Sequence, residues 1–194
     1  IILVSSLGQS IKFDEKDISN LKRIPEMKYV VPLYFKSTRV EAGEEEKFAY
    51  VMGVSEELFP LMGKEAIEGK IFTKSDVEAR SKTAVLGFRI AESLFDNPKE
   101  AVDKTVRFNN QRYKVIGVAE KGGDREQDLS IIIPYKTTYG SMNPDKTFWA
   151  IYLGVESEEN VSGAKQKVEE ALLKRYDKDD FAVTEQAEIL STVN

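Results

Sequence analysis

The sequence of 194 residues contains no cysteine and no histidine. Without cysteine the chain has no disulfide and no thiol nucleophile, and without both residue types the usual zinc sites are excluded. The absence of imidazole also excludes a catalytic triad or a general base built on histidine. We therefore expect no enzymatic activity, no cofactor, and no catalytic, cofactor-binding or metal-binding residues.

Long apolar runs and clusters of positive charge are missing as well. No apolar run reaches the ~20 residues of a membrane-spanning helix, and no signal peptide is visible. The net charge is −5 and the basic residues are scattered, which argues against a nucleic-acid-binding surface. Because the first residue is Ile1 rather than Met, we expect the chain to be a segment of a longer protein.

The composition that remains is that of a folded protein. Hydrophobic residues make up 41% of the chain and charged residues 31%, which is typical of globular proteins rather than of disordered ones. The length suffices for one large domain or two small ones. Ten Phe and eight Tyr supply enough bulk to fill a core.

The first part of the chain predicts a β-α-β-β segment. Asp14 is a typical N-cap residue for a helix whose apolar residues recur on one face, and Pro25 ends that helix. Two strands with alternating apolar residues follow, joined by a turn around Gly43. Pro32 favours an edge position for the first of them. The predicted elements are a strand over 1–5, a helix over 14–24, and strands over 29–40 and 47–54.

The last part predicts a β-α-β segment after a polar turn at 143–146, the best linker candidate in the chain. Its helix carries acidic residues at the start and basic residues at the end, which suits the helix dipole. The predicted elements are a strand over 148–155, a helix over 158–176 and a strand over 181–184.

The middle of the chain consists of many short elements. Thr73 and Asp76 have the spacing of a capping box, and Asn109-Asn110-Gln111 is a strong hairpin signal. Gly122-Gly123 is interpreted as a flexible hairpin tip. The predicted elements are helices over 55–63 and 73–80, a helix after Gly87, and strands over 83–86, 105–108, 112–118 and 129–133.

This change of texture predicts an α+β protein with two subdomains. Residues 1–54 and 147–194 would form one subdomain from both chain ends, and residues 55–146 would form a second, inserted one. The chain would then cross twice between the subdomains. We expect hinges at these crossings, with Gly53, Ser55, Asn143 and Asp145 as the hinge residues.

Motifs along nearly the whole chain resemble the periplasmic core domain of MacB-like ABC-transporter permeases, in family order and at family spacing. Each motif alone is only strand, turn or helix-start chemistry, and together they are specific. The resemblance is carried by Gly53-Val54-Ser55, Glu68-Gly69-Lys70-Ile71-Phe72-Thr73, Ala84-Val85-Leu86-Gly87, Lys104-Thr105-Val106-Arg107, Tyr113-Lys114-Val115-Ile116-Gly117-Val118, Ile133-Pro134-Tyr135 and Gln186-Ala187-Glu188-Ile189-Leu190.

The resemblance implies a fold and a function. The fold is a porter-like βαβ subdomain from both chain ends with an inserted mixed α/β subdomain. The domain would lie on the periplasmic or extracellular side of the cell membrane, between two transmembrane helices of a dimeric permease. It would transmit ATP-driven motion of those helices and engage a membrane-anchored adaptor protein. The implied partners are an ABC ATPase, the adaptor and, in the full transporter, a second copy, whereas the isolated domain would be a monomer.

Two other functions stay open from the residues. A stand-alone extracytoplasmic domain that binds a peptide or a lipid would need a deep apolar cleft. A hydrolase would need a polar constellation in a cleft, and the sequence shows none. The relay function makes a geometric demand of its own, namely that Ile1 and Asn194 lie close together.

Three local features also have a plain and a functional interpretation. The run Glu44-Glu45-Glu46 is expected to be a solvated turn rather than a cation site. The aspartates at 177, 179 and 180 lack the glycine and the distal glutamate of a calcium loop. Phe148 and Trp149 begin a strand, so one should point into the core and the other outward, where it could contact an adaptor.

Overall fold

The computed structural model describes residues 1–8 and 12–185. Contacts between Cα atoms divide the chain into two compact units. The end unit consists of Ile1–Leu33 together with the chain from Asp145 onward, and the inserted unit is Tyr34–Pro144. Strand β2 (Met27–Ala42) belongs to the end unit up to Leu33 and to the inserted unit from Tyr34.

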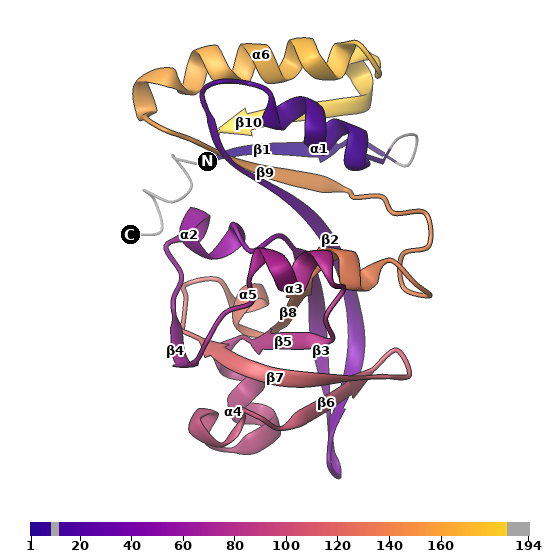
Figure 1. The fold of residues 1–194 in the computed structure, drawn as a ribbon, viewed down its shortest axis with the longest axis vertical. Helices are drawn as coiled ribbons and strands as arrows, with labels where there is room; N and C mark the ends of the chain where they lie inside the picture. Colours follow the sequence, from indigo (N-terminus) through magenta and orange to yellow (C-terminus); the bar gives the residue numbers. More distant parts are fainter. Residues whose placement is uncertain (9–11, 186–194) are drawn as a thin grey trace. The chain divides into compact units, whose positions relative to one another are not determined.

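The end unit is a split βαβ fold (Figure 1). Its sheet has the order β10-β1-β9-β2, and every neighbouring pair is antiparallel. Because β1 and β2 both pair with β9, they run parallel to each other with β9 between them, which is the ferredoxin-like arrangement. Besides the first half of β2, the end unit contains β1 (Ile2–Ser6), α1 (Glu15–Lys22), β9 (Ala150–Val155), α6 (Val161–Leu173) and β10 (Phe181–Glu185).

Local sequence explains these elements. Asp14 caps α1, and a reciprocal capping box joins its side chain and backbone to those of Asp17. Ile18 and Leu21 form the buried stripe of this helix. Pro32 lies in β2 where that strand is the edge of the end unit's sheet, opposite Ile151 of β9, so its missing N–H is not needed.

The inserted unit closes its strands into a ring. The order β2-β3-β8-β5-β7 continues through β6 back to β2, where Glu41 pairs with Arg107. β8 is parallel to β3, and β5 is parallel to β7. The elements are β3 (Glu45–Val54), α2 (Leu58–Met62), β4 (Ala66–Gly69), α3 (Lys74–Glu78), β5 (Thr83–Leu86), α4 (Phe88–Phe95), β6 (Thr105–Phe108), β7 (Gln111–Ala119), α5 (Arg125–Asp128) and β8 (Ser130–Pro134).

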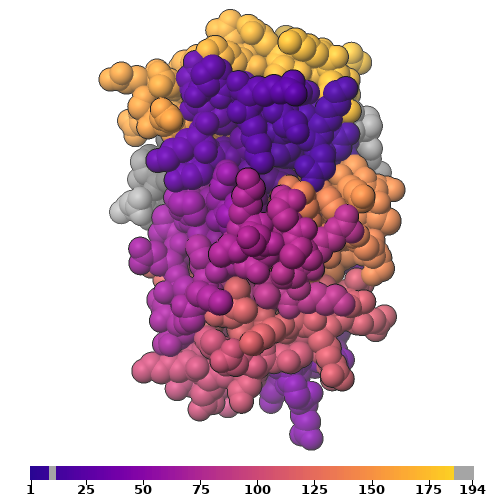
Figure 2. Space-filling model, viewed as in Figure 1, coloured from indigo at the N-terminus to yellow at the C-terminus, as the bar shows by residue number. Residues whose placement is uncertain are grey.

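The core of the inserted unit is apolar. Side chains from β2, β3, β5, β6, β7 and β8 meet those of α4 in one buried cluster. Inside it the rings of Phe108 and Tyr113 stack with their centroids 4.1 Å apart. The β2–β3 hairpin projects beyond this core, and its turn around Gly43 forms a narrow finger (Figure 2).

A close backbone contact joins β4 to β7. Gly69 and Gly117 are register partners. A Cβ atom on Gly117 would lie 2.1 Å from the carbonyl oxygen of Lys70, and one on Gly69 would lie 2.1 Å from that of Ile116. Only glycine permits this approach, which explains why both positions lack a side chain.

Most of the predicted elements are present, with one strand missed and one loop misinterpreted. Strand β4 has only four residues and went unpredicted, because four residues are too few for an alternation signal. Gly122-Gly123 is no hairpin tip, because β8 pairs with β3 and β5 rather than with β7. There the short helix α5 follows, and the Gly122 amide donates to the Asp128 carboxylate over 2.9 Å.

The boundaries of the two units differ from those predicted. The second crossing lies after Pro144 rather than after Lys146. The first lies after Leu33 rather than after Val54, so residues 34–54 belong to the inserted unit. The reason is that β2 is one strand that pairs with β9 in its first half and with β3 in its second half. A continuous strand leaves no turn or linker signal where it changes units.

Candidate functional site

In the end unit, the first residues and Glu185 lie at one end of the sheet, and the first connection to the inserted unit leaves from the other end. Ile2 pairs with Glu185 on one side and with Leu153 on the other. At the opposite end of the same sheet, Ala150 pairs with Ser5 and with Leu33, the last residue before the first crossing. The expected closeness of Ile1 and Asn194 falls partly outside the described residues, since Asn194 is not among them.

A polar cluster, which we term the clasp, ties α1 to the end of α6 in the end unit. The guanidinium of Arg175 donates to Asp14 and to Asp17 at 2.8 Å each, and the hydroxyl of Tyr176 donates to Asp17 at 2.7 Å. Asp17 is buried with 1% of its side chain exposed, so these bonds replace the water that it lost on folding. The Tyr176 ring also packs against buried Phe13 in a T-shaped arrangement.

The clasp shifts the titration of its members. The hydrogen bond from Arg175 holds the pKa of Asp14 below its ordinary value, against the opposing effect of burial. Burial, together with the hydrogen bond to Asp17, raises the pKa of the Tyr176 hydroxyl. Both shifts stabilise the protonation states that the clasp uses, so it is a structural element that stays formed around neutral pH.

The four hinge residues expected from the sequence lie at different places. Gly53 lies in β3 of the inserted unit, and a Cβ atom there would lie 2.8 Å from the Thr138 side chain. Ser55 follows it and is buried. Asn143 is buried too, and its backbone N–H donates to the Thr138 carbonyl over 2.8 Å. Of the four, Asn143 and Asp145 flank the crossing after Pro144, whereas Gly53 and Ser55 are away from both crossings.

Phe148 and Trp149 divide as their alternation predicts. Phe148 is fully buried and forms an isolated bridge with Phe13, and Trp149 is 41% exposed. The ammonium of Lys12 lies 4.9 Å from the centre of the Trp149 ring and covers part of it.

The sequence-based interpretation missed an aromatic surface on the β2–β3 hairpin. Phe35, Phe48 and Tyr50 share one face, because Tyr50 is opposite Ser37, and Phe48 is opposite Arg39. Phe48 is 55% exposed and Phe35 37% exposed. Tyr50 stacks on Phe35 at 5.1 Å and meets Phe48 edge-on at 5.2 Å. The spacing of Phe48 and Tyr50 was the available signal, since alternate residues of a strand share a face.

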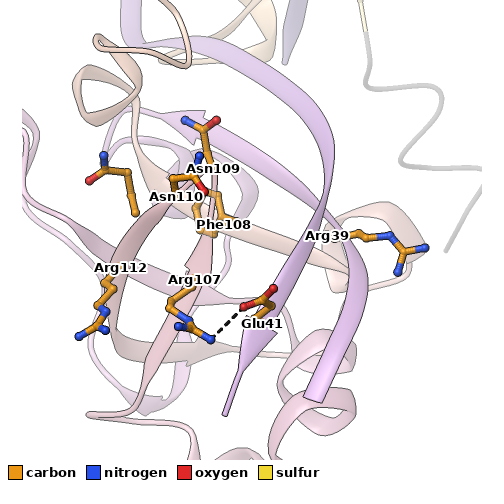
Figure 3. A pocket seen from close by; sticks show the side chains of 8 residues that line it. Arg39, Glu41, Arg107, Phe108, Asn109, Asn110 and Arg112 are labelled. Carbon is orange, nitrogen blue, oxygen red and sulfur yellow. Dashed lines mark hydrogen bonds and ion pairs between the residues drawn. The ribbon is translucent and has the colours of Figure 1, made fainter. Parts of the chain in front are cut away.

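Arginines continue this surface onto β6 and β7. The guanidinium of Arg107 forms an ion pair with the carboxylate of Glu41 on β2 at 2.9 Å. Arg39 forms an ion pair with Glu46 at 3.3 Å. Arg112 lies directly opposite Arg107 on β7. An open pocket of about 340 Å³ lies among these strands. Figure 3 shows Arg107 between Glu41 and Arg112. The Arg39 side chain points away from these three residues.

Two acidic runs have plain structural roles. Glu45 and Glu46 pair with Lys47 and Arg39 on the hairpin. The Asp177 amide donates to Asp180 over 3.0 Å in a reciprocal capping box of a short 3₁₀ helix. Across residues 1–8 and 12–185, no group of three or more potential ligands is placed to hold a metal ion.

Comparison with known proteins identifies the class. The family model of the MacB-like periplasmic core domain matches residues 2–171, so the chain belongs to that family. No helix within the described ranges is both long enough and apolar enough to cross a bilayer.

Relatives and solved structures agree with this assignment. The macrolide export ATP-binding/permease protein MacB of Chlorobaculum tepidum is 28% identical over 93% of this chain and 29% of its own length. The pyoverdine export ATP-binding/permease protein PvdT of Pseudomonas savastanoi is 24% identical over 90% of this chain and 27% of its own length. The chain thus spans little more than a quarter of these curated relatives.

Two solved structures share the fold. The periplasmic region of MacB from Actinobacillus actinomycetemcomitans superposes with a TM-score of 0.86 at 22% identity, covering 99% of this chain and 91% of that one. The extracellular domain of the noncanonic ABC-type transporter YknZ from Gram-positive bacteria gives a TM-score of 0.79 at 20% identity, covering 95% of this chain and 99% of that one. The expected α+β porter-like fold is confirmed.

Proposed function

We propose that this chain is the extracytoplasmic relay of an ABC-transporter permease. It passes ATP-driven motion of the flanking membrane helices to an adaptor protein and performs no chemistry of its own. The family membership and the ATP-binding/permease relatives support this proposal. In the full transporter the chain would act with an ABC ATPase and a second permease copy, on the periplasmic or extracellular side of the membrane.

The single observation that carries the proposal is the polarity of the end unit. At one end of its sheet, Ile2 pairs with Glu185. At the other end of the same sheet, the chain passes into the inserted unit after Leu33. A four-stranded sheet whose two helices are clasped together moves as a rigid body. Displacement applied at one end is therefore delivered at the other, where the two crossings are.

The crossings are the natural hinges of this relay. We propose that one lies at Leu33–Tyr34, where β2 exchanges β9 for β3, and that the other lies at Asn143–Asp145. Gly53 and Ser55 keep a smaller role in this scheme, because both are packed inside the inserted unit.

Spin-label distances in the full-length permease test the proposal. Because this chain has no cysteine, labels are introduced at will, after any cysteines elsewhere in the permease are replaced. One pair, Lys16→Cys with Lys99→Cys, joins exposed sites in the two units. The matched pair, Lys16→Cys with Lys174→Cys, lies wholly in the end unit.

Distances are measured in membranes with and without ATP, in labelled subunits diluted with unlabelled ones. We expect the pair between units to change its distance distribution and the pair within the end unit to keep it. If both distributions are the same in the two nucleotide states, the chain does not relay motion and the proposal is wrong.

A further inference from the structure

We infer that the outward face of β2, β3, β6 and β7 in the inserted unit is the surface that binds the adaptor protein. We call it the hairpin face. Its centre is Phe35, Phe48 and Tyr50, and its rim is Arg39, Arg107 and Arg112 together with Glu41 and Glu46. The inference rests on the proposed function, because the relay presupposes an adaptor.

The centre has the composition of a binding hot spot. Aromatic side chains in mutual contact offer a large apolar area at small cost in conformational entropy, and they dominate measured interface energies. The two phenylalanines are left substantially exposed although the same hairpin buries Val40, Ala49 and Val51 completely on its other face. Exposure of adjacent aromatic rings on a projecting hairpin serves association rather than the core.

The rim indicates the chemistry of the partner. Two of its arginines are already neutralised, by Glu41 and by Glu46. The side chain of Arg112 makes no ion pair or hydrogen bond with the described residues, and it is directly opposite another arginine, Arg107. Glu41 neutralises Arg107 but not Arg112, so a further carboxylate beside Arg112 is favoured. The partner surface that fits is apolar at its centre with carboxylates at its edge.

This charge balance argues against a second copy of the chain as the occupant. The rim holds three arginines and two glutamates, so it is positive overall. In a symmetric contact the same patch faces itself, and two positive rims would oppose each other. An acidic surface of a different protein has no such penalty.

Trp149 is the competing adaptor contact, and it is the weaker one. It is a single exposed ring, and Lys12 already covers part of it. The hairpin face combines three rings with Arg112, whose side chain has no partner among residues 1–8 and 12–185, in reach of one partner surface.

Co-purification and photo-crosslinking in native membranes test the inference. The tagged full-length permease is purified as wild type, as Phe35→Ser/Phe48→Ser and as Arg112→Glu, and the adaptor is identified and quantified by mass spectrometry. The matched controls are Leu173→Ser, an exposed apolar residue of the end unit, Lys22→Glu, an exposed charge there, and Trp149→Ala. Urea unfolding of the isolated chain checks that each variant folds. A p-benzoylphenylalanine at position 48, with position 173 as control, reports the direct contact.

We expect the amount of co-purified adaptor to fall at least tenfold in Phe35→Ser/Phe48→Ser and in Arg112→Glu, the two hairpin-face variants. The three control variants should retain the adaptor. Of the two photo-crosslinker positions, only position 48 should crosslink to it. If wild type recovers no adaptor, the adaptor role itself fails, and the inference fails with it. If wild type recovers the adaptor and the hairpin variants recover it equally, only the assignment of the hairpin face fails. Crosslinking of position 48 to a second permease, or to no protein, also overturns the assignment.

Discussion

The end unit and the inserted unit are stabilised in different ways. The end unit buries an apolar core of its own, with Val4, Ile18 and Val168 among its residues, and adds to it a polar clasp, in which a buried carboxylate holds the end of one helix against the start of another. The inserted unit relies on an apolar cluster inside a ring of strands and on a backbone contact between Gly69 and Gly117. In a unit with two helices on a sheet, directional hydrogen bonds define how the helices are placed against each other. In the closed ring of the inserted unit, strand pairing and apolar packing define how the elements are arranged.

The largest effect is expected from Gly117→Ala in the inserted unit. Its Cβ atom would lie 2.1 Å from a backbone oxygen, so β4 and β7 must separate. We expect a loss of at least about 3 kcal/mol in the free energy of unfolding. Urea transitions followed by far-UV circular dichroism measure it. Gly140→Ala is the matched control, with no atom within 4 Å of its Cβ, and it should stay within about 0.5 kcal/mol.

The same experiment tests whether the two units are separate. Trp149 is the single tryptophan and lies in the end unit, so its fluorescence reports that unit. The fluorescence transition of Gly117→Ala should shift less than the circular dichroism transition. Equal shifts would mean that the units unfold together and that the contrast between them has no energetic meaning.

The next largest effect is expected from Asp17→Ala in the end unit. This change leaves the Arg175 guanidinium and the Tyr176 hydroxyl without their shared buried partner, and it removes half of a capping box. We expect a loss of about 3 kcal/mol, read from the fluorescence of Trp149 in urea. Lys16→Ala, an exposed neighbour on the same helix, should have almost no effect. A loss below about 1 kcal/mol for Asp17→Ala would show that the clasp does not stabilise the end unit.

A gain in stability is expected from Asp96→Gly in the inserted unit. Asp96 ends α4 with φ of 63° and ψ of −47°, and the Asn97 amide bonds to the Phe95 carbonyl across it, which is a tight γ-turn. This backbone conformation is strained for any residue with a Cβ atom. We expect a gain of about 1 kcal/mol by circular dichroism in urea, and no gain for Asp96→Ala. Equal stability of the two variants would mean that the turn is not strained.

The smallest effect is a difference in acid sensitivity. The pKa of Asp14 is lowered in the folded state by Arg175, so its contribution is present above its ordinary value of 3.8 and is lost as the pH falls through the folded-state value. Asp14 is partly exposed, and the contribution is therefore only about 0.5 kcal/mol. In Asp14→Asn, stability of the end unit between neutral pH and about pH 3 should fall less than in wild type. Identical pH profiles by fluorescence would contradict this cause.

Several features of the molecule follow from local sequence alone. The capping residues Asp14 and Thr73 set the starts of their helices, and Asn109-Asn110 sets a hairpin turn in which both residues have positive φ. Alternation predicted that one of Phe148 and Trp149 is buried and the other exposed, and in the structure Phe148 is the buried one. These features depend on residues within a few positions of each other, so a single segment contains the information. The family resemblance, which sums such signals along the chain, predicted the fold class correctly.

Other features were decided only by the tertiary structure. The pairing of Arg175 with Asp14 and Asp17 joins positions about 160 residues apart, and nothing local to either helix indicates it. The first boundary between the units lies inside β2, because the change of partner from β9 to β3 depends on strands that are distant in sequence. The hairpin face likewise forms only when β6 closes the ring against β2 and brings Arg107 to Glu41. Local sequence determines what each segment can form, and long-range pairing determines which side chains meet, because the free energy of those contacts exists only once the sheets close.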